Sequence, residues 1–213
     1  MLRTPSEFCE FFKRFCKRME AEFGREGVVA QILSDGGRYY EKSAALQAFC
    51  RQKGIVQLFS PPYTQSLNGV AERTIRTVVE MGRTMLLHAG TPTYLYGYAL
   101  TYAVYVLNRL PHRARAEATR RELWTGKKFK RGLSAIRTWG SASWVHKVHP
   151  TGPHADALSA KATLHIFLGV DDQGRGYRLA RLPNYKIVHS AHVTFNESFF
   201  PCREGSHRND DDD

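Results

Sequence analysis

The pattern of apolar residues changes near Pro111, and this change limits the chain to a fold in two parts. Before Pro111, runs with apolar residues three and four positions apart alternate with short continuous apolar runs. Alternating helix-like and strand-like segments are typical of an α/β fold. After Ile136 the apolar runs are short and separated by turn residues, which favours a small all-β barrel.

The first part is predicted to contain four helices and two strands. Its opening helix starts with a capping box at Thr4–Glu7 and continues to glycines at 24 and 27. Further helices are expected over residues 42–53, 68–88 and 92–108, and strands over 28–33 and 55–59. The helix over 92–108 is apolar nearly all round, so we expect it to be buried against a sheet or a partner. The buried side of the third helix is predicted to consist of Val70, Ile75, Val78, Val79, Met81, Met85 and Leu86.

The second part is predicted to contain five short strands. They are expected over Ser143–Val148, Thr163–Val170, Gly176–Ala180, Lys186–His189 and His192–Phe195, with a hairpin turn at Asp171–Gly174. The expected domains are therefore an α/β part over 1–112, a basic linker over 113–135, a barrel over 136–200 and a disordered acidic tail over 201–213.

The charge of the chain indicates a polyanionic partner. Its 31 Lys and Arg exceed its 20 Asp and Glu, which gives a net charge of +11. Nucleic acid is the expected partner, ahead of a membrane surface, and a merely soluble basic protein is the alternative. Residues 111–150 hold ten Lys or Arg against two acidic residues. The predicted phosphate contacts in this stretch are Lys127, Lys128, Lys130 and Arg131.

Several other classes of protein are disfavoured by the sequence. The four cysteines form no CxxC pair, so neither a zinc knuckle nor a disulfide framework is expected, and buried reduced thiols are. The pairs His146 with His149 and His189 with His192 lack a matching Cys or carboxylate and are interpreted as surface or half-buried residues. No signal peptide and no apolar run of about 18 residues is present, so the chain is expected to be neither secreted nor membrane-spanning.

Two carboxylates are candidates for a metal site. Asp35 follows a predicted strand, and Glu72 lies one turn into the predicted helix that follows a turn-rich loop. Carboxylates from different elements that meet at a sheet edge can hold Mg²⁺, and two such ions can assist phosphoryl transfer. The alternative is structural: Asp before Gly-Gly is common in turns, and Glu in a first turn complements the helix dipole.

Seven segments in order resemble one known family. The chain reads SDGGRYY and FCRQKGIVQLFSPPYTQSLNGVAERTIRT, then YAVYVLNRLPHR, ELWTGKK, WGSASWVH, IFLGVDDQGRGYRL and HVTFNE. These segments resemble the integrase region of copia-type long-terminal-repeat retrotransposon polyproteins. The NGVAER segment is specific, and the resemblance extends from the first helix to about Phe200.

The resemblance implies a ribonuclease H-like core followed by an SH3-like barrel. Members of the family cut and join DNA ends with an Asp-Asp-Glu triad that holds two Mg²⁺ or Mn²⁺ ions. Asp35 matches the second acid of that triad and Glu72 the third. Gln65, Asn68, Arg73 and Arg76 would then face DNA, although a solvated helix face is the alternative for the two arginines. The family also implies DNA as partner and the nucleus as location.

The sequence departs from the family pattern at three points. The interval between Asp35 and Glu72 is one position longer than usual, and the asparagine after the aspartate is missing. Gln65 stands where the family has proline. Asp35 is the earliest aspartate in the chain, so the first acid of the triad and the preceding zinc-binding domain are absent from these 213 residues.

The predicted function is that of a partial integrase, with end processing and strand transfer as the reaction of the intact parent. One alternative is a catalytically dead relic that binds nucleic acid. Another is an assembly module that self-associates through the barrel and the apolar helix over 92–108.

Overall fold

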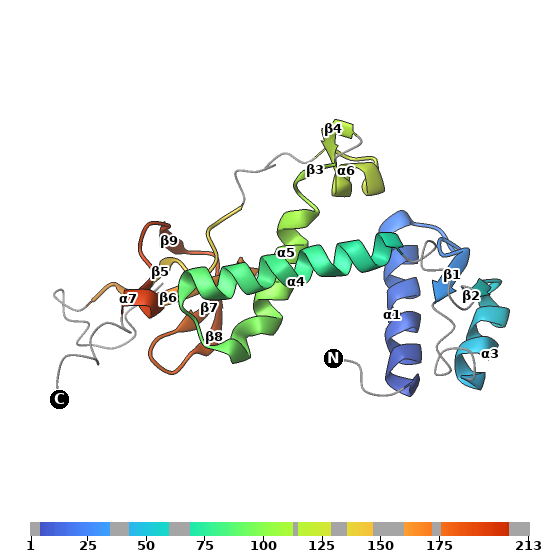
Figure 1. The fold of residues 1–213 in the computed structure, drawn as a ribbon, viewed down its shortest axis with the longest axis horizontal. Coiled ribbons are helices and arrows are strands. Elements are labelled where there is room, and N and C mark those ends of the chain that lie inside the picture. Colours follow the sequence, from blue (N-terminus) through green and yellow to red (C-terminus); the bar gives the residue numbers. More distant parts are fainter. Residues whose placement is uncertain are drawn as a thin grey trace, which may run out of the picture. The chain divides into compact units, whose positions relative to one another are not determined.

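The computed structural model describes residues 5–34, 43–59, 69–112, 115–128, 136–146, 160–171 and 176–204. The chain divides into two compact units, residues 1–74 and 75–213. Figure 1 shows the elements of each unit along the chain. Each unit is described by itself.

The first unit combines two helices with a parallel pair of strands. It contains α1 (Pro5–Phe23), β1 (Gln31–Ser34), α3 (Ala44–Lys53) and β2 (Val56–Phe59). Strand β1 pairs in parallel with β2, in a register that runs from Gln31 opposite Val56 to Ser34 opposite Phe59. Parallel strands require a crossover connection, and α3 supplies it. Strand β1 begins three residues later than the strand predicted over 28–33.

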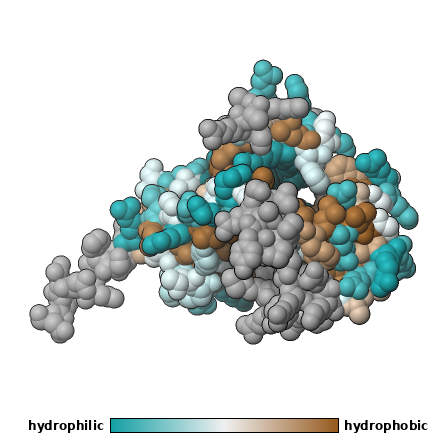
Figure 2. Space-filling view, turned by 45° about the vertical axis from the view of Figure 1, so that its right-hand side comes forward, coloured by the Kyte–Doolittle hydropathy of each residue, from teal (hydrophilic) through white to brown (hydrophobic). Residues whose placement is uncertain are grey.

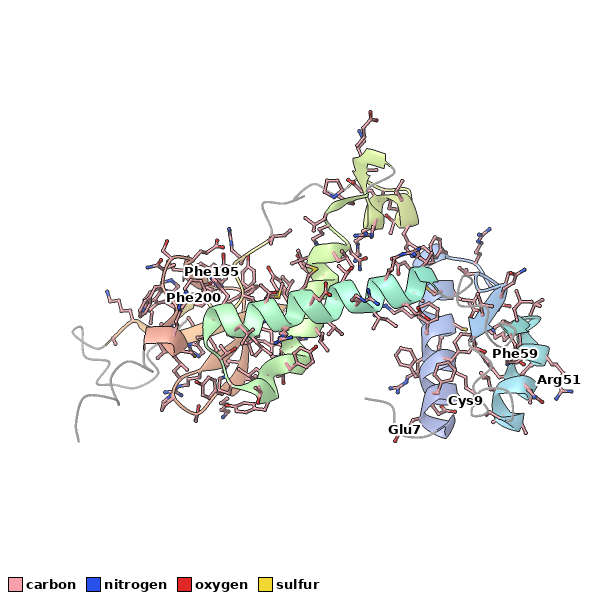
Figure 3. All side chains as sticks on the ribbon, viewed as in Figure 1. Glu7, Cys9, Arg51, Phe59, Phe195 and Phe200 are labelled. Carbon is pink, nitrogen blue, oxygen red and sulfur yellow. The ribbon has the colours of Figure 1, made fainter. Side chains whose placement is uncertain are left out.

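The core of this unit lies between α1 and α3. Apolar residues three and four positions apart on α1 meet those of α3 because helical periodicity places them on one side of each helix. The buried members of this cluster are Cys9, Phe12, Cys16, Leu46, Cys50 and Ile55. Figure 3 labels Cys9 on α1, and its sulfur is buried among these residues. The thiols at positions 9, 16, 50 and 202 are free, and the first three are buried as predicted, whereas Cys202 is only partly buried.

The second unit consists of a helical hairpin and an antiparallel sheet. Helix α4 (Gly69–Ala89) enters it, and a 3₁₀ turn (Thr93–Leu95) leads into α5 (Tyr96–Leu107). Five strands follow: β5 (Ala142–His146), β6 (Ala162–Val170), β7 (Tyr177–Arg181), β8 (Lys186–Ser190) and β9 (Val193–Asn196). They form one sheet in the order β8-β7-β6-β5-β9. A short helix, α7 (Pro201–Glu204), comes last.

These elements confirm the predicted fold class of an α/β part followed by a small β domain. All five strands occur where they were expected, within one or two residues at each end. Of the predicted turn at 171–174, Asp171 is described, and the remaining residues lie outside the described part of the chain.

One side of helix α5 is buried against the sheet, as expected, whereas Val104 on another side is 43% exposed. The helix contacts β6, and both elements contribute to one core. The fully buried members of this core are Ala89, Ala99, Ile166, Phe167, Leu168, Leu179 and Ala180. The loop before β5 passes close to α4 at Gly140, where φ is +76° and a Cβ atom would overlap the Cβ of Ala89. Only glycine satisfies both conditions there.

Hydrogen bonds join α5 to the segment that leads into β5. The Tyr102 hydroxyl donates to the backbone oxygen of Arg137 at 2.6 Å and accepts from its backbone N–H at 2.8 Å. The indole of Trp139 donates to the carbonyl of Leu168 at 3.1 Å. Burial raises the pKa of Tyr102 well above its ordinary value, so its hydroxyl remains protonated and able to donate.

The carboxylate of Glu197 fixes the other side of the same segment. It accepts hydrogen bonds from the N–H of Thr138 at 2.7 Å and from its hydroxyl at 2.8 Å, and it pairs with Arg137 at 3.2 Å. Burial favours the neutral acid, but these hydrogen bonds and the arginine charge outweigh it, so the pKa of Glu197 lies below its ordinary value.

Part of the segment predicted to be a basic linker is folded. It contains β4 (Arg115–Thr119), which pairs with β3 (Pro111–His112) just before the linker, and α6 (Arg120–Thr125). Thr119 and Glu122 form a capping box at the start of α6, and Gly126 ends it in the left-handed conformation. Such short motifs depend on local caps rather than on a long apolar pattern.

The predicted buried side of α4 is correct only in its second half. Val70 and Ile75 are 70% and 63% exposed, and Val79 is exposed as well. Burial begins at Gly82, where a Cβ atom would come within 2.9 Å of Leu100 on α5. The periodicity of a helix marks its apolar side but does not say how far along its length a neighbour covers that side.

We expect Tyr102→Phe to destabilise the second unit by about 1–3 kcal/mol, because it leaves the N–H and carbonyl of Arg137 without their partner. The matched control is Tyr105→Phe, whose hydroxyl makes no hydrogen bond among the described residues and whose loss should cost less than about 0.5 kcal/mol. Urea unfolding of both variants measures the difference. Equal losses would contradict the assigned role of the Tyr102 hydroxyl.

The stability contributed by Glu197 should depend on pH. Because its folded pKa lies below the ordinary value of 4.5, its contribution is complete above that pH and is lost as pH falls through the folded pKa. The advantage of the native chain over Glu197→Gln in unfolding free energy should therefore shrink between about pH 5 and pH 3. Glu80→Gln on the exposed side of α4 is the control and should show no such trend. A pH-independent difference for Glu197→Gln would argue against the ionised carboxylate.

Candidate functional site

The two parallel strands of the first unit end at the same edge. Strand β1 ends at Ser34 and β2 at Phe59, and these two residues are register partners. Figure 3 labels Phe59 at this edge. Asp35 follows β1 directly in the sequence. Residues 35–42 lie outside the described part of the chain, so the structure does not describe the side chain of Asp35.

Glu72 occupies the first turn of α4. The helix begins at Gly69, and the side chain of Glu72 is exposed. A carboxylate at this position is favoured by the partial positive charge of the helix N-terminus. Gln65 and Asn68 belong to residues 60–68, which lie outside the described part. The structure therefore describes one of the two predicted metal ligands and two of the four predicted DNA contacts beside it.

The charged residues at the start of α4 share one side of the helix. At about 100° per residue, Arg76 lies between Glu72 and Arg73 around the axis, and all three fall within an arc of about 100°. The guanidinium of Arg73 folds back toward Gly69, 3.5 Å from the place where a Cβ atom would stand. All three side chains are exposed. The helix thus presents a carboxylate and two guanidinium groups together, in its exposed first part.

The described residues contain no group of three or more His, Cys, Asp or Glu side chains that could hold a metal ion. The chemistry of the predicted donors nevertheless suits Mg²⁺, which prefers carboxylate oxygens and is often held by only one or two of them. Glu72 fits because its carboxylate is exposed and has no ion pair or hydrogen bond among the described residues. The metal site at Asp35 and Glu72 stays a prediction.

The basic segment supplies fewer free cations than its composition suggests. Lys127 and Lys128 are exposed just after α6. Arg120 donates to the carbonyl of Leu107 at 3.1 Å, and Arg137 pairs with Glu197. Lys130 and Arg131 lie outside the described residues. The two exposed lysines are therefore the described part of the predicted phosphate-binding set.

A charged cluster beside the β7–β8 hairpin was missed by sequence reasoning. The Asp171 carboxylate is 2% exposed and lies 3.1 Å from Nδ1 of His189 and 3.8 Å from a guanidinium nitrogen of Arg178. Arg178 and His189 are register partners in the hairpin. Sequence reasoning could have placed Arg178 beside His189 only by predicting this register of β7 with β8, because register partners in a sheet project on the same side.

Comparisons with known proteins agree along the chain. Residues 141–208 match the retroviral polymerase SH3-like domain. The chain is 32% identical over 198 residues to the retrovirus-related Pol polyprotein from transposon TNT 1-94 of Nicotiana tabacum, covering 93% of this chain and 14% of that protein. It is also 32% identical over 202 residues to the Pol polyprotein from transposon RE1 of Arabidopsis thaliana, covering 94% and 13%. The chain thus spans about one seventh of the length of these relatives.

Two solved structures show weaker likeness. One is the catalytic core domain of BIV integrase, at 19% identity and a TM-score of 0.43, over 59% of this chain and 74% of that one. The other is a simian T-cell lymphotropic virus intasome in complex with PP2A regulatory subunit B56 gamma, at 17% identity and a TM-score of 0.46, over 91% and 65%. Among the described helices, none has the length and hydropathy needed to cross a membrane.

Proposed function

From the premise that this chain is homologous to the integrase region of copia-type retrotransposon polyproteins, we propose that it forms part of a DNA-integrating enzyme. Its contribution would be two metal-binding acids and a DNA-binding surface. The predicted resemblance to this family is confirmed by relatives that cover more than nine tenths of the chain. The single observation that carries the proposal is the position of Glu72, which lies in the exposed first turn of α4, within the NGVAER segment.

In the proposed site, Asp35 and Glu72 hold a divalent metal ion, as integrases generally require. The metal, when bound, would activate a water or a DNA 3′-hydroxyl and stabilise the departing oxygen. The chain's own part would be to orient the DNA: Arg73 and Arg76, next to Glu72 on α4, would contact phosphates near the reacting one. Integration acts on host DNA, so we place this function in the nucleus.

The proposed active site requires a third acid. Residues 1–34 contain no aspartate. We propose that in the longer polyprotein this acid comes from outside the 213 residues. The binding site for the metal would then be completed only when that segment pairs with or packs beside β1.

A non-catalytic role in assembly is favoured by one observation. Leu33, Val56 and Leu58 project from one side of the β1–β2 pair and are exposed, whereas α1 and α3 bury the other side. Parallel sheets are normally covered on both faces. Figure 2 shows brown, apolar patches on the viewed face of the molecule. Under this alternative the chain would self-associate and would bind nucleic acid without cutting the nucleic acid.

We expect the 213-residue chain alone to show no strand transfer in Mg²⁺ or Mn²⁺, so Glu72→Gln should change nothing. A longer chain that carries an upstream strand with an aspartate should be active, and Glu72→Gln should reduce that activity to background. Glu80→Gln, two turns further along the exposed side of α4, is the control and should leave the activity intact. Robust activity of the 213-residue chain, lost in Glu72→Gln, would contradict the requirement for an outside acid.

Binding of duplex DNA should be tolerant of sequence and strongly dependent on salt. Replacing Lys127, Lys128, Lys130 and Arg131 with glutamine should make the slope of log K against log salt less steep by about 3–4 units, because each lost phosphate contact contributes about 0.9. Fluorescence anisotropy over a salt series measures the slope.

The control for this experiment removes the same charge elsewhere. Four basic residues on α1, Lys13, Arg14, Lys17 and Arg18, are replaced with glutamine in a second variant. The α1 variant should keep the native slope. An unchanged slope in the first variant, or an equal change in both, would contradict phosphate binding by residues 127–131.

A further inference from the structure

A pocket of about 450 Å³ lies within the second unit, between the start of α5 and the β7–β8 hairpin. One wall is formed by Tyr94, Gly97, Tyr98 and Thr101, and the other by Arg178, Ile187 and His189. Pockets that hold small ligands commonly measure about 300–1,000 Å³ and combine apolar walls with a few polar groups. This pocket has that size and that combination of groups.

The polar side of the pocket is held in place by Asp171. Its buried carboxylate lies against His189 and Arg178, which project side by side from neighbouring strands. A buried carboxylate is costly unless cationic groups and hydrogen-bond donors surround it. Nδ1 of His189 is close to this carboxylate but has no hydrogen-bond partner among the described residues. Arg178 keeps guanidinium N–H groups that can donate to an anion, and the free ring nitrogen of His189 can donate as well when the imidazole is protonated.

The opposite wall is aromatic. Tyr94 and Tyr98 are four residues apart, on the 3₁₀ turn and on α5 respectively. Tyr94 is 66% exposed, and its ring forms a T-shaped pair with that of Tyr185, with 5.8 Å between the ring centroids. The guanidinium of Arg178 lies 5.7 Å from the centre of the Tyr98 ring. Tyr98 is half-buried, so Tyr94 offers the more exposed ring, and aromatic rings of this kind stack favourably on nucleic-acid bases.

Gly97 leaves the backbone of α5 uncovered between the two tyrosines of the pocket wall. It lies inside α5, where glycine is less stable than alanine. A Cβ atom at this position would meet no other atom of the described residues within 4 Å, so packing does not require glycine. Close approach of a ligand to the backbone is a reason for glycine that remains. The residue also lines the pocket.

We propose that this pocket binds a single unstacked nucleotide, with its phosphate at Arg178 and His189 and its base against Tyr94 and Tyr98. Arg178 and His189 line the pocket and Asp171 does not, so the pocket favours an anionic group rather than a cation. The flat aromatic faces suit a base, which a small inorganic anion or an acidic peptide would leave unused. This inference rests on the proposed function as a DNA-binding protein and names a second mode of binding, to a single strand.

The experiment uses the full 213-residue chain and three probes: thymidine monophosphate, a short oligothymidylate and a duplex of arbitrary sequence. Gly97→Leu should fill the pocket and lower oligothymidylate affinity at least tenfold, and Gly97→Ala should give a smaller loss. Arg178→Gln should lower it by a similar factor because the phosphate loses its cation. Circular dichroism and thermal melting should show that the Gly97 variants remain folded, since the added side chain enters open space.

The matched control is Arg181→Gln. Arg181 lies three residues further along β7, on the other side of the strand, and is exposed. The substitution removes the same charge without touching the pocket, so it should change oligothymidylate affinity by less than about twofold. Retained oligothymidylate affinity in folded Gly97→Leu, or an equal loss in Arg181→Gln, would overturn the proposal.

The probes separate this inference from the proposed function. Binding of the duplex without the single strand or the mononucleotide would overturn the pocket and leave DNA binding intact. Binding of no probe would overturn both. Single-strand binding sensitive to Gly97→Leu supports the pocket whatever the duplex does. Competition by thymidine monophosphate would identify free nucleotides as a ligand, and its absence would restrict the ligand to a nucleotide within a strand.

Discussion

Two hydrogen bonds between the Tyr102 hydroxyl and the backbone of Arg137 fix the position of α5 in the second unit. They tie α5 to the segment before β5, thirty-five positions further along the chain. Glu197 holds the same segment from the end of β9, and Gly140 lets it pass close to Ala89. Helix α5 is therefore a covering layer of the sheet, and the aromatic core around Phe167 depends on it.

This arrangement also places chemistry at the margin of the sheet. Because α5 is fixed over β6, its first turn lies beside the β7–β8 hairpin and closes a pocket there. The groups in that pocket come from segments distant in sequence, whereas Glu72, Arg73 and Arg76 are neighbours on one helix. The first kind of site depends on a folded unit, whereas the grouping of Glu72, Arg73 and Arg76 needs only that α4 be helical at its start.

The sequence predicted most elements because their signals are local. Strands β5 to β9 are short apolar runs separated by turn residues, and α1 has a regular Phe-rich face. The capping box at Thr119 and Glu122 is equally local, but the segment was predicted to be a linker because of its many basic residues. Which apolar residues of α4 are covered, and which histidine meets Arg178, depend on packing and register. No single segment contains that information. Asp35, Gln65, Asn68, Lys130 and Arg131 lie outside the described residues, so their roles stay predictions.

The buried cysteines have a practical consequence for anyone who labels this protein. Cys9, Cys16 and Cys50 are enclosed between α1 and α3, and burial raises the pKa of the last two thiols. Cys202 is half-buried, and burial raises its pKa as well. Thiol-reactive dyes attack thiolates, so the native cysteines should react slowly at neutral pH. A single cysteine introduced on the exposed side of α4 would then carry a fluorophore selectively, without first removing the other four.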